Sequence, residues 1–505
     1  MSRILTAIAV AATALAPLAT TAAATATRQD ILWLDRVTYG PSTATVDEYL
    51  KLGRRRFLAE QLHPSRDEHL PQPAATQIAA LDSSHASNAE LLAAVFKEQQ
   101  RINALTDDTQ KQTDRKALNE RGNKLAYEAA RGQILRALYS PAQLREQMTW
   151  FWLNHFSVFQ YKANNAWSVG DYADQAIRPH ALGHFRDLVM ATLTHPAMLQ
   201  YLDNAQNAAG HVNENYAREL LELHTLGVGS GYTQQDIQEL ARVLTGVGVN
   251  LAGNEPKLKP EWQRLYRHQG AFEFNPARHD FGAKTLLGAH FEGRGFDEVE
   301  QAVDLLVSQP ACAQFVSRKL AVYFVSDDPP RSLTDRMAKT FVKSHGDIAE
   351  VLETLLKSRE FAASLGSKFK DPMHYVISTV RLAYDGKPII NTHPVVNWLN
   401  ALGEPLFGRQ TPDGYPLVEN GWASSGQISR RFEIARAIGS GNGGLFEPED
   451  GSPPATTGFP QLSGRLYFTA VEPFLSAHAR TALDRAGSQL EWNTFLLASP
   501  DFNYR

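Results

Sequence analysis

The chain has 505 residues, of which 43% are hydrophobic and 21% are charged. Its 50 Lys and Arg and 54 Asp and Glu residues give a formal net charge of −4. This near balance argues against nucleic acid or an anionic membrane surface as a partner. Cys312 is the only cysteine, which excludes an intramolecular disulfide. Its apolar neighbours predict a small buried thiol, because no adjacent basic residue activates it as a nucleophile.

Residues 1–26 have the pattern of a secretory signal peptide. Arg3 precedes an uncharged run from Ile4 to Leu18, which is too short to span a membrane, and small residues follow. We expect cleavage after the small-residue triplet that ends at Ala26, or after the one that ends at Ala24. Loss of Arg3 leaves 49 basic residues, so the net charge becomes about −5. The sequence therefore predicts a periplasmic or secreted protein with no membrane span after cleavage.

Helical spacing of apolar residues dominates the mature chain, residues 27–505. Residues 28–62 predict two or three short helices, broken at Tyr39-Gly40-Pro41. Residues 86–137 carry dense alternating charge beside one apolar stripe, which predicts a protruding helical hairpin with a solvated side. A partner-binding arm is the alternative interpretation of this segment. Both remain open at the level of sequence.

The segment from Leu144 to Phe159 is apolar on nearly every side and predicts a central buried helix. His155 falls on the same face as Phe151 and Trp152. It is a candidate catalytic residue, with a hydrogen-bonded core histidine as the alternative. Asn154 beside it needs buried partners.

The most informative segment is a polar helix from Asn213 to Gly227. At about 100° per residue, Glu219 and Glu222 share its polar arc, and His224 lies on the apolar one. Facing a cleft, these carboxylates would hold a metal or supply acid and base groups. The alternative is a surface ladder in which Glu222 and its neighbours pair with Arg218. The spacing differs from the Glu-x-x-His of di-metal helices, so the sequence assigns no metal or cofactor.

The last candidate group follows an aperiodic stretch between Asn250 and Gly270, which predicts a long surface loop. His279, Asp280 and Lys284 lie close together in sequence after it. Such side chains orient one another for proton transfer, although turn-forming polar clusters have the same composition.

Residues 438–460 are rich in Gly, Pro and Ser and predict a flexible loop. The whole pattern predicts a mainly α protein. We expect one domain, residues 27–505, built as a large multi-helix globular array with long loops and a charged helical hairpin. No nucleophile elbow, phosphate-binding loop, His-Glu-x-x-His or zinc pattern occurs in the sequence.

Seven stretches carry a family resemblance: RVTYGPS (Arg36 to Ser42), FWLNHFSV (Phe151 to Val158), IRPHALGHFRDL (Ile177 to Leu188), HPAMLQYLDNAQN (His195 to Asn207), NENYARELLELHTLGVGSGYTQQDIQELARVLTG (Asn213 to Gly246), HDFGAKTLLG (His279 to Gly288) and LLASPDF (Leu496 to Phe502). Together they resemble the bacterial family called domain of unknown function 1800. The resemblance implies a secreted or envelope-associated, mainly helical protein, encoded beside exported sulfatase-like or alkaline-phosphatase-like proteins. It implies no agreed reaction, cofactor or catalytic residue. Residues 86–137 exceed the family's usual spacer, which makes them an insertion.

Two functional hypotheses follow. The first is an envelope enzyme, a hydrolase or modifier acting on an extracytoplasmic polymer or glycan, and it requires the polar motifs to converge on one cleft. The second is a non-catalytic partner or assembly factor for a neighbouring secreted sulfatase-like protein. In that case the 86–137 hairpin is the contact arm, and the polar motifs are caps and buried networks.

Overall fold

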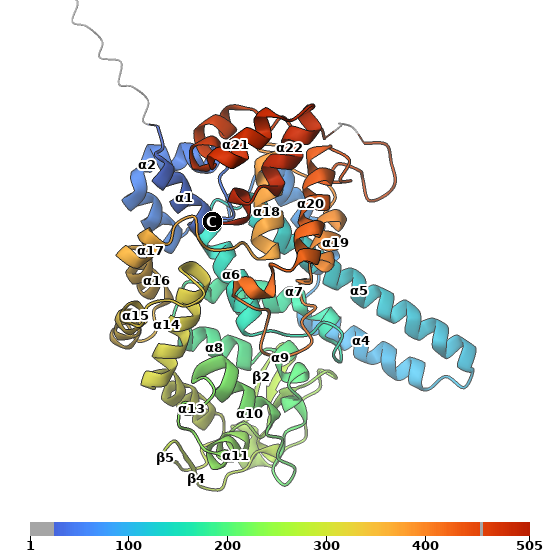
Figure 1. Cartoon of the computed structure of the whole chain (residues 1–505). Coiled ribbons are helices and arrows are strands. Elements are labelled where there is room, and N and C mark those ends of the chain that lie inside the picture. The colour runs from blue at the N-terminus through green and yellow to red at the C-terminus, as the bar shows by residue number, and fades with distance from the viewer. Residues whose placement is uncertain (1–24, 455–457) are drawn as a thin grey trace, which may run out of the picture.

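A computed structural model of the chain describes residues 25–454 and 458–505, and the expected signal peptide lies almost wholly outside these residues. Within them the protein is mainly helical, as expected (Figure 1). The first helices are α1 (Arg28–Val37), α2 (Thr43–Leu62) and α3 (Gln72–Ala79). The gap between α1 and α2 contains the expected break at Gly40, and α2 is itself kinked at Gly53, where φ is 72°.

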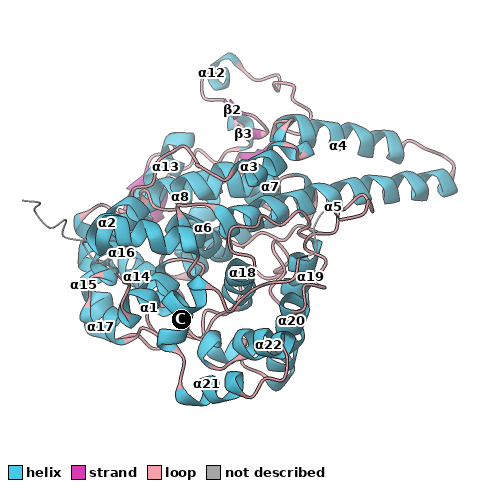
Figure 2. Cartoon of the chain, turned by 90° about the horizontal axis from the view of Figure 1, so that it is seen from above, coloured by secondary structure: helices cyan, strands magenta, loops and turns pink. Residues whose placement is uncertain are grey.

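A long antiparallel hairpin follows, formed by α4 (Asn88–Asn103) and α5 (Asp108–Tyr139). Figures 1 and 2 show these two helices side by side, extending away from the rest of the molecule. A small separate core joins the base of the hairpin to the body through Leu92, Val95, Leu125, Trp167 and Ala271. Charged pairs such as Arg101 with Asp114 lie on the exposed part, as expected for a solvated hairpin.

The centre of the molecule is α6 (Gln143–His155), all of whose residues are buried. The expected helix continued to Phe159, but it ends at His155, and Phe156 leaves the helical region with φ −103° and ψ 52°. The end of a helix cannot be predicted within an all-apolar run, because a buried irregular segment has the same composition. Phe156 instead packs its ring on Trp152, Phe185 and His224.

The elements that follow α6 are α7 (Val169–Asp171), α8 (Phe185–Leu193), α9 (Pro196–Tyr201), α10 (Asn215–Glu219) and α11 (Gln234–Val243). Three-residue strands come next, together with one short helix: β1 (Val247–Val249), α12 (Pro260–Gln263), β2 (Arg267–Gln269), β3 (Phe272–Phe274), β4 (Lys284–Leu286) and β5 (Ala289–Phe291). They form a sheet in the order β1-β3-β2 and a separate β4–β5 hairpin, both antiparallel. Strands this short contain too few alternations for sequence periodicity to reveal them.

The second half is again helical: α13 (Phe296–Ser308), α14 (Pro310–Phe324), α15 (Arg331–Lys343), α16 (Ile348–Leu356), α17 (Arg359–Ala363), α18 (Pro372–Ala383), α19 (His393–Ala401), α20 (Ser425–Gly439), α21 (Ala477–Asp484) and α22 (Gln489–Ala498). One continuous apolar core runs from α1 to α22. Cys312 of α14 is fully buried in it, and burial raises the pKa of its thiol. Of residues 438–460, the first two end α20 and the other described ones form no helix or strand. Their flexibility stays a prediction.

Candidate functional site

A histidine at the end of α6 contacts a lysine from α14. The Nε2 atom of His155 lies 3.0 Å from the carbonyl oxygen of His224, and its Nδ1 atom lies 2.9 Å from Nζ of Lys319. A carbonyl oxygen only accepts hydrogen bonds, so Nε2 carries the ring proton. Nδ1 is therefore the acceptor for Lys319, and His155 is neutral in this arrangement.

Helix geometry explains how the lysine reaches this position. Phe315, Lys319 and Tyr323 follow one another at four-residue intervals and form one ridge of α14. The ridge faces α6, where ring centroids are 5.2 Å apart for Tyr323 and Phe151, and 6.1 Å apart for Phe315 and His155. The amine thus lies on an otherwise aromatic ridge, and its side chain remains partly exposed.

Burial has a large effect on the protonation of this pair. It lowers the pKa of Lys319 from its usual 10.5 to about 8. Burial, with the nearby lysine charge, lowers the pKa of His155 well below its usual range and that of His224 to about 3. Between lysine and histidine, the proton therefore stays on Lys319, which titrates close to neutral pH. Among the described residues, no carboxylate lies within ion-pair distance of its amine.

The backbone around His224 departs from the expected regular helix. After α10 the chain widens into a π-helical segment, Leu220–Thr225, and the amides of Leu226 and Gly227 both reach the carbonyl of Leu221. Wide turns of this kind are rare, and spacing of about 100° per residue does not predict them. At the end of the segment, the carbonyl of His224 has no partner within the helix, so it accepts from His155.

The two predicted carboxylates of this helix have different surroundings. Glu222 and Glu214 flank Arg218, at 3.5 and 3.1 Å, which is the expected surface ladder. Glu219 is outside the ladder. Burial, with the charge of Glu222, raises its pKa. Burial and the charge of Glu219 likewise raise the pKa of Tyr201 in α9, so the Glu219 carboxyl lies on the side of α9.

An irregular segment, residues 403–418, closes the site on its remaining side. The side-chain amide of Asn154 donates to the carbonyl of Tyr415 at 3.0 Å and accepts from its backbone N–H, as a neighbouring strand would. The Tyr201 hydroxyl donates to the carbonyl of Gln410 at 2.9 Å. Asp413 in this segment is paired with Arg409 at 2.9 Å and is 54% exposed. Asp413 therefore lies at the solvent side of the site.

The charge of Asp413 acts on both Lys319 and Glu219, and neither of these two groups is among the causes of the other's pKa shift. This charge raises the pKa of Lys319 in opposition to burial, and it adds to the rise at Glu219. The candidate site thus consists of His155, His224, Lys319, Glu219 and Asp413, which come from α6, the π-helical segment, α14, α10 and residues 403–418. Of these five residues, sequence spacing predicted only His155 and Glu219 as site residues. Lys319 could have been noticed in the sequence as a lysine on the apolar stripe between Phe315 and Tyr323.

His279 and Lys284 belong to a separate buried cluster, and the partly exposed Asp280 lies beside it. Lys284 Nζ lies 2.8 Å from Oε1 of Glu298 in α13, and His279 Nε2 hydrogen-bonds to the same oxygen. The three side chains are at most 1% exposed. Asp280 pairs with Arg242 of α11 at 2.8 Å. These contacts fasten the β4–β5 hairpin to α11 and α13.

The structure does not bring this cluster to the candidate site. None of the hydrogen bonds or ion pairs of His279, Asp280 and Lys284 reaches His155 or Glu219. A proton acceptor that solvent does not reach has no access to a substrate. His155 is equally buried, so it belongs to the candidate site only as the partner of Lys319, and Glu219 belongs to it as a partly exposed carboxyl group. We assign His279 and Lys284 a structural role.

Within residues 25–454 and 458–505, no group of three or more His, Cys, Asp and Glu side chains is arranged to hold a metal ion. A cavity of about 840 Å³ lies elsewhere, between α2, the α5–α6 junction and α18, and none of the six predicted site residues lines it. The cavity and the residues with shifted pKa values therefore lie at different places in the molecule. We place the candidate site at Lys319, because its amine contacts a buried neutral histidine and because groups with perturbed pKa values are frequent at functional sites.

Among the described helices, none is both long enough and apolar enough to cross a membrane. Comparisons with curated proteins and with solved structures returned no match. A family model described as a protein of unknown function, DUF1800, matches residues 32–504, which is nearly the whole chain. The resemblance noted in the sequence is thereby confirmed, and the chain belongs to this family.

Proposed function

We propose that this chain is an extracytoplasmic enzyme that performs general acid–base chemistry on an envelope polymer or glycan, with Lys319 as the base and Glu219 as the acid. The supporting observation is the amine of Lys319, which donates its hydrogen bond to the neutral ring of His155 and has no carboxylate of the described residues within ion-pair distance. The signal-peptide pattern of residues 1–26 supports the location outside the cytoplasm.

The surroundings of the two groups suit opposite roles. A lysine that titrates near pH 8 is in part neutral at physiological pH, and its free amine accepts a proton. A carboxyl group with a raised pKa stays protonated to a higher pH and can give its proton to a leaving oxygen. In hydrolysis, Lys319 would take a proton from the attacking water while Glu219 protonates the departing group. The exposed Asp413 lies on the side from which a long substrate approaches.

The test is conversion of candidate polymers by the purified chain. Peptidoglycan sacculi and envelope polysaccharides are incubated with the protein, and released fragments are identified by mass spectrometry. Removal of a general base or acid lowers the rate by about 10²- to 10⁴-fold, so we expect losses of this size for Lys319→Met and Glu219→Gln. Lys343→Met and Glu433→Gln, both exposed, are the matched controls. Undiminished release by Lys319→Met would contradict the role of this lysine.

A second candidate function is that of a non-catalytic partner or assembly factor for a neighbouring secreted sulfatase-like protein. The observation in its favour is the α4–α5 hairpin, which extends away from the body in both views (Figures 1 and 2). Residues 101–117, the outer part, can be removed without touching the core at the base, because Leu92, Val95 and Leu125 of that core lie outside this segment. Residues 101–117 are replaced by a short Gly-Ser linker, and partners are isolated from envelope extracts. Loss of a sulfatase-like protein from the captured set, together with no polymer conversion by the full chain, would favour this function.

A further inference from the structure

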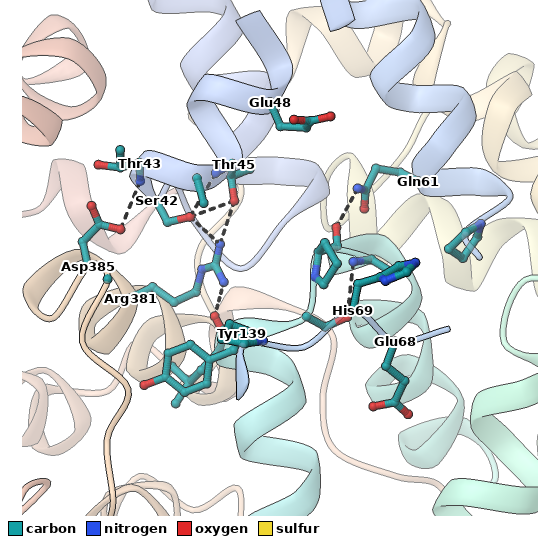
Figure 3. A pocket seen from close by; sticks show the side chains of 18 of the residues that line it. Ser42, Thr43, Thr45, Glu48, Gln61, Glu68, His69, Tyr139, Arg381 and Asp385 are labelled. Carbon is teal, nitrogen blue, oxygen red and sulfur yellow. Dashed lines mark hydrogen bonds between the residues drawn. The ribbon is translucent and has the colours of Figure 1, made fainter. Parts of the chain in front are cut away.

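A second candidate site is the cavity of about 840 Å³, which Lys319 does not line (Figure 3). Its walls come from both ends of α2, residues 64–71, the α5–α6 junction and the C-terminal end of α18. The volume falls within the range of sites that enclose small molecules. Phe57, Leu138, Val380 and Tyr384 give it apolar walls.

The one arginine of the cavity is already bound to the protein. Arg381 donates to the carbonyls of Gly40 and Leu138 and to the hydroxyls of Ser42 and Thr45, the last two at 3.2 and 3.1 Å. Burial lowers its pKa to about 10, so it remains charged at neutral pH. With its donors directed at four protein oxygens, the guanidinium has little capacity left for an anionic ligand.

Acidic side chains outnumber this arginine along the walls: Glu48, Glu60, Asp67, Glu68 and Asp385. Three of them have cationic partners: Glu48 lies 3.3 Å from Lys51, Glu60 lies 3.0 Å from Arg56, and Glu68 lies 2.6 and 3.2 Å from Arg178 and Arg136. Asp385 has a different environment, because its carboxylate accepts only a backbone N–H, that of Thr43 at 3.1 Å. Figure 3 shows Asp385 on one side of the cavity and Glu68 with His69 on the other.

We propose that this cavity binds an amphipathic amine, whose apolar body packs against Phe57, Leu138 and Tyr384 and whose ammonium group lies near Asp385. Charge complementarity selects the ligand class. The charge of Asp385 acts on Arg381, but among the described residues no cation lies within ion-pair distance of its carboxylate. Such a carboxylate attracts an ammonium group in a partly enclosed, apolar space, where screening by water is reduced. An anionic ligand would meet the carboxylates of Asp67 and Asp385, which form no ion pair among the described residues, and an arginine whose hydrogen bonds are already made. The proposal is independent of the Lys319 chemistry.

The test uses three probes with one indole body and different charges: tryptamine, indole-3-propionamide and indole-3-propionate. Their binding to the full chain is measured by isothermal titration calorimetry at neutral pH and low salt. We expect tryptamine to bind at least about tenfold more tightly than the amide, and the propionate to bind most weakly. Asp385→Asn retains an acceptor for Thr43 and removes the charge, so it should reduce the tryptamine preference several-fold.

Ala44→Trp places a large side chain at an exposed position of the cavity wall, and it should abolish binding of all three probes. Ala59→Trp, at an exposed position of the same helix that does not line the cavity, is the control and should bind as the unmodified chain does. Equal or tighter binding of the propionate would overturn the proposal. Unchanged binding by Ala44→Trp, or no binding of any probe up to millimolar concentration, would overturn it as well.

Discussion

Replacement of Lys319 by methionine tests the protonation argument without any knowledge of the substrate. Methionine has a similar length and no charge. The fall in the lysine pKa from 10.5 to about 8 corresponds to about 3 kcal/mol against the charged amine in the folded state. This penalty is fully present below pH 8, where the amine is protonated in both states. As the pH rises from 8 toward 10.5, the folded amine is neutral while the unfolded one remains charged, so the penalty disappears and stability rises.

The measurement is the free energy of unfolding of both proteins by denaturant at several pH values. Between about pH 6 and about pH 9.5 the unmodified chain should gain about 1–2 kcal/mol relative to Lys319→Met, a figure reduced to allow for the partial exposure of the side chain. The methionine variant also loses the hydrogen bond to His155, but this loss is constant over the range. Lys343→Met, at an exposed position, controls for removal of a lysine. A stability difference that stays constant with pH would refute the reasoning.

Three further variants test the remaining structural assignments. Asn154→Ala removes both hydrogen bonds to Tyr415, a local cost of about 2 kcal/mol, and should speed limited proteolysis within residues 403–418; an unchanged cleavage rate would mean that other contacts hold the segment. Glu298→Gln leaves Lys284 without its counter-charge and should destabilise the chain by about 3–5 kcal/mol, measured by denaturant unfolding, whereas a neutral effect would argue against a structural ion cluster. Gly227→Ala combines φ of +88° with a Cβ only 2.7 Å from the Phe315 ring and should lower stability by about 1–3 kcal/mol in thermal unfolding. Full stability of this last variant would show that Phe315 moves aside at no cost.

Periodicity predicted the mainly helical fold and several of its helices. The hairpin of α4 and α5 and the buried character of α6 follow from patterns within one segment, where helical spacing is a direct signal. The departures have local physical causes. The π-helical segment Leu220–Thr225 is held by bonds to Leu221 and by tertiary packing, neither of which is visible in spacing. The three-residue strands were missed because their pairing, such as Val247 with Phe274, lies between segments.

The candidate site was predictable only in part, for a similar reason. His155 and Glu219 stand out within their own helices, and both belong to the site. Lys319 contacts His155 across 164 positions of sequence, and no periodic pattern predicts such a pair. His279 was expected to share a cleft with His155 and Glu219, because all three lie on or next to apolar helices in the sequence. His279 instead satisfies its hydrogen bonds with Thr245 and Glu298, which are separated from it by 34 and 19 positions.

The buried lysines of this chain provide a comparison within one molecule. Lys284, Lys368 and Lys370 each lie within ion-pair distance of a carboxylate, at 2.8 Å from Glu298 for the first and 3.4 Å from Asp35 for the third. A buried ammonium group needs such a counter-charge to offset its loss of hydration. Lys319 has a neutral imidazole in that place, so its folded state favours the free amine. Burial also lowers the pKa of Lys368 and Lys370, but there a carboxylate within ion-pair distance opposes the shift. Under the proposed function, the missing counter-charge is what lets the amine of Lys319 accept a proton from a substrate.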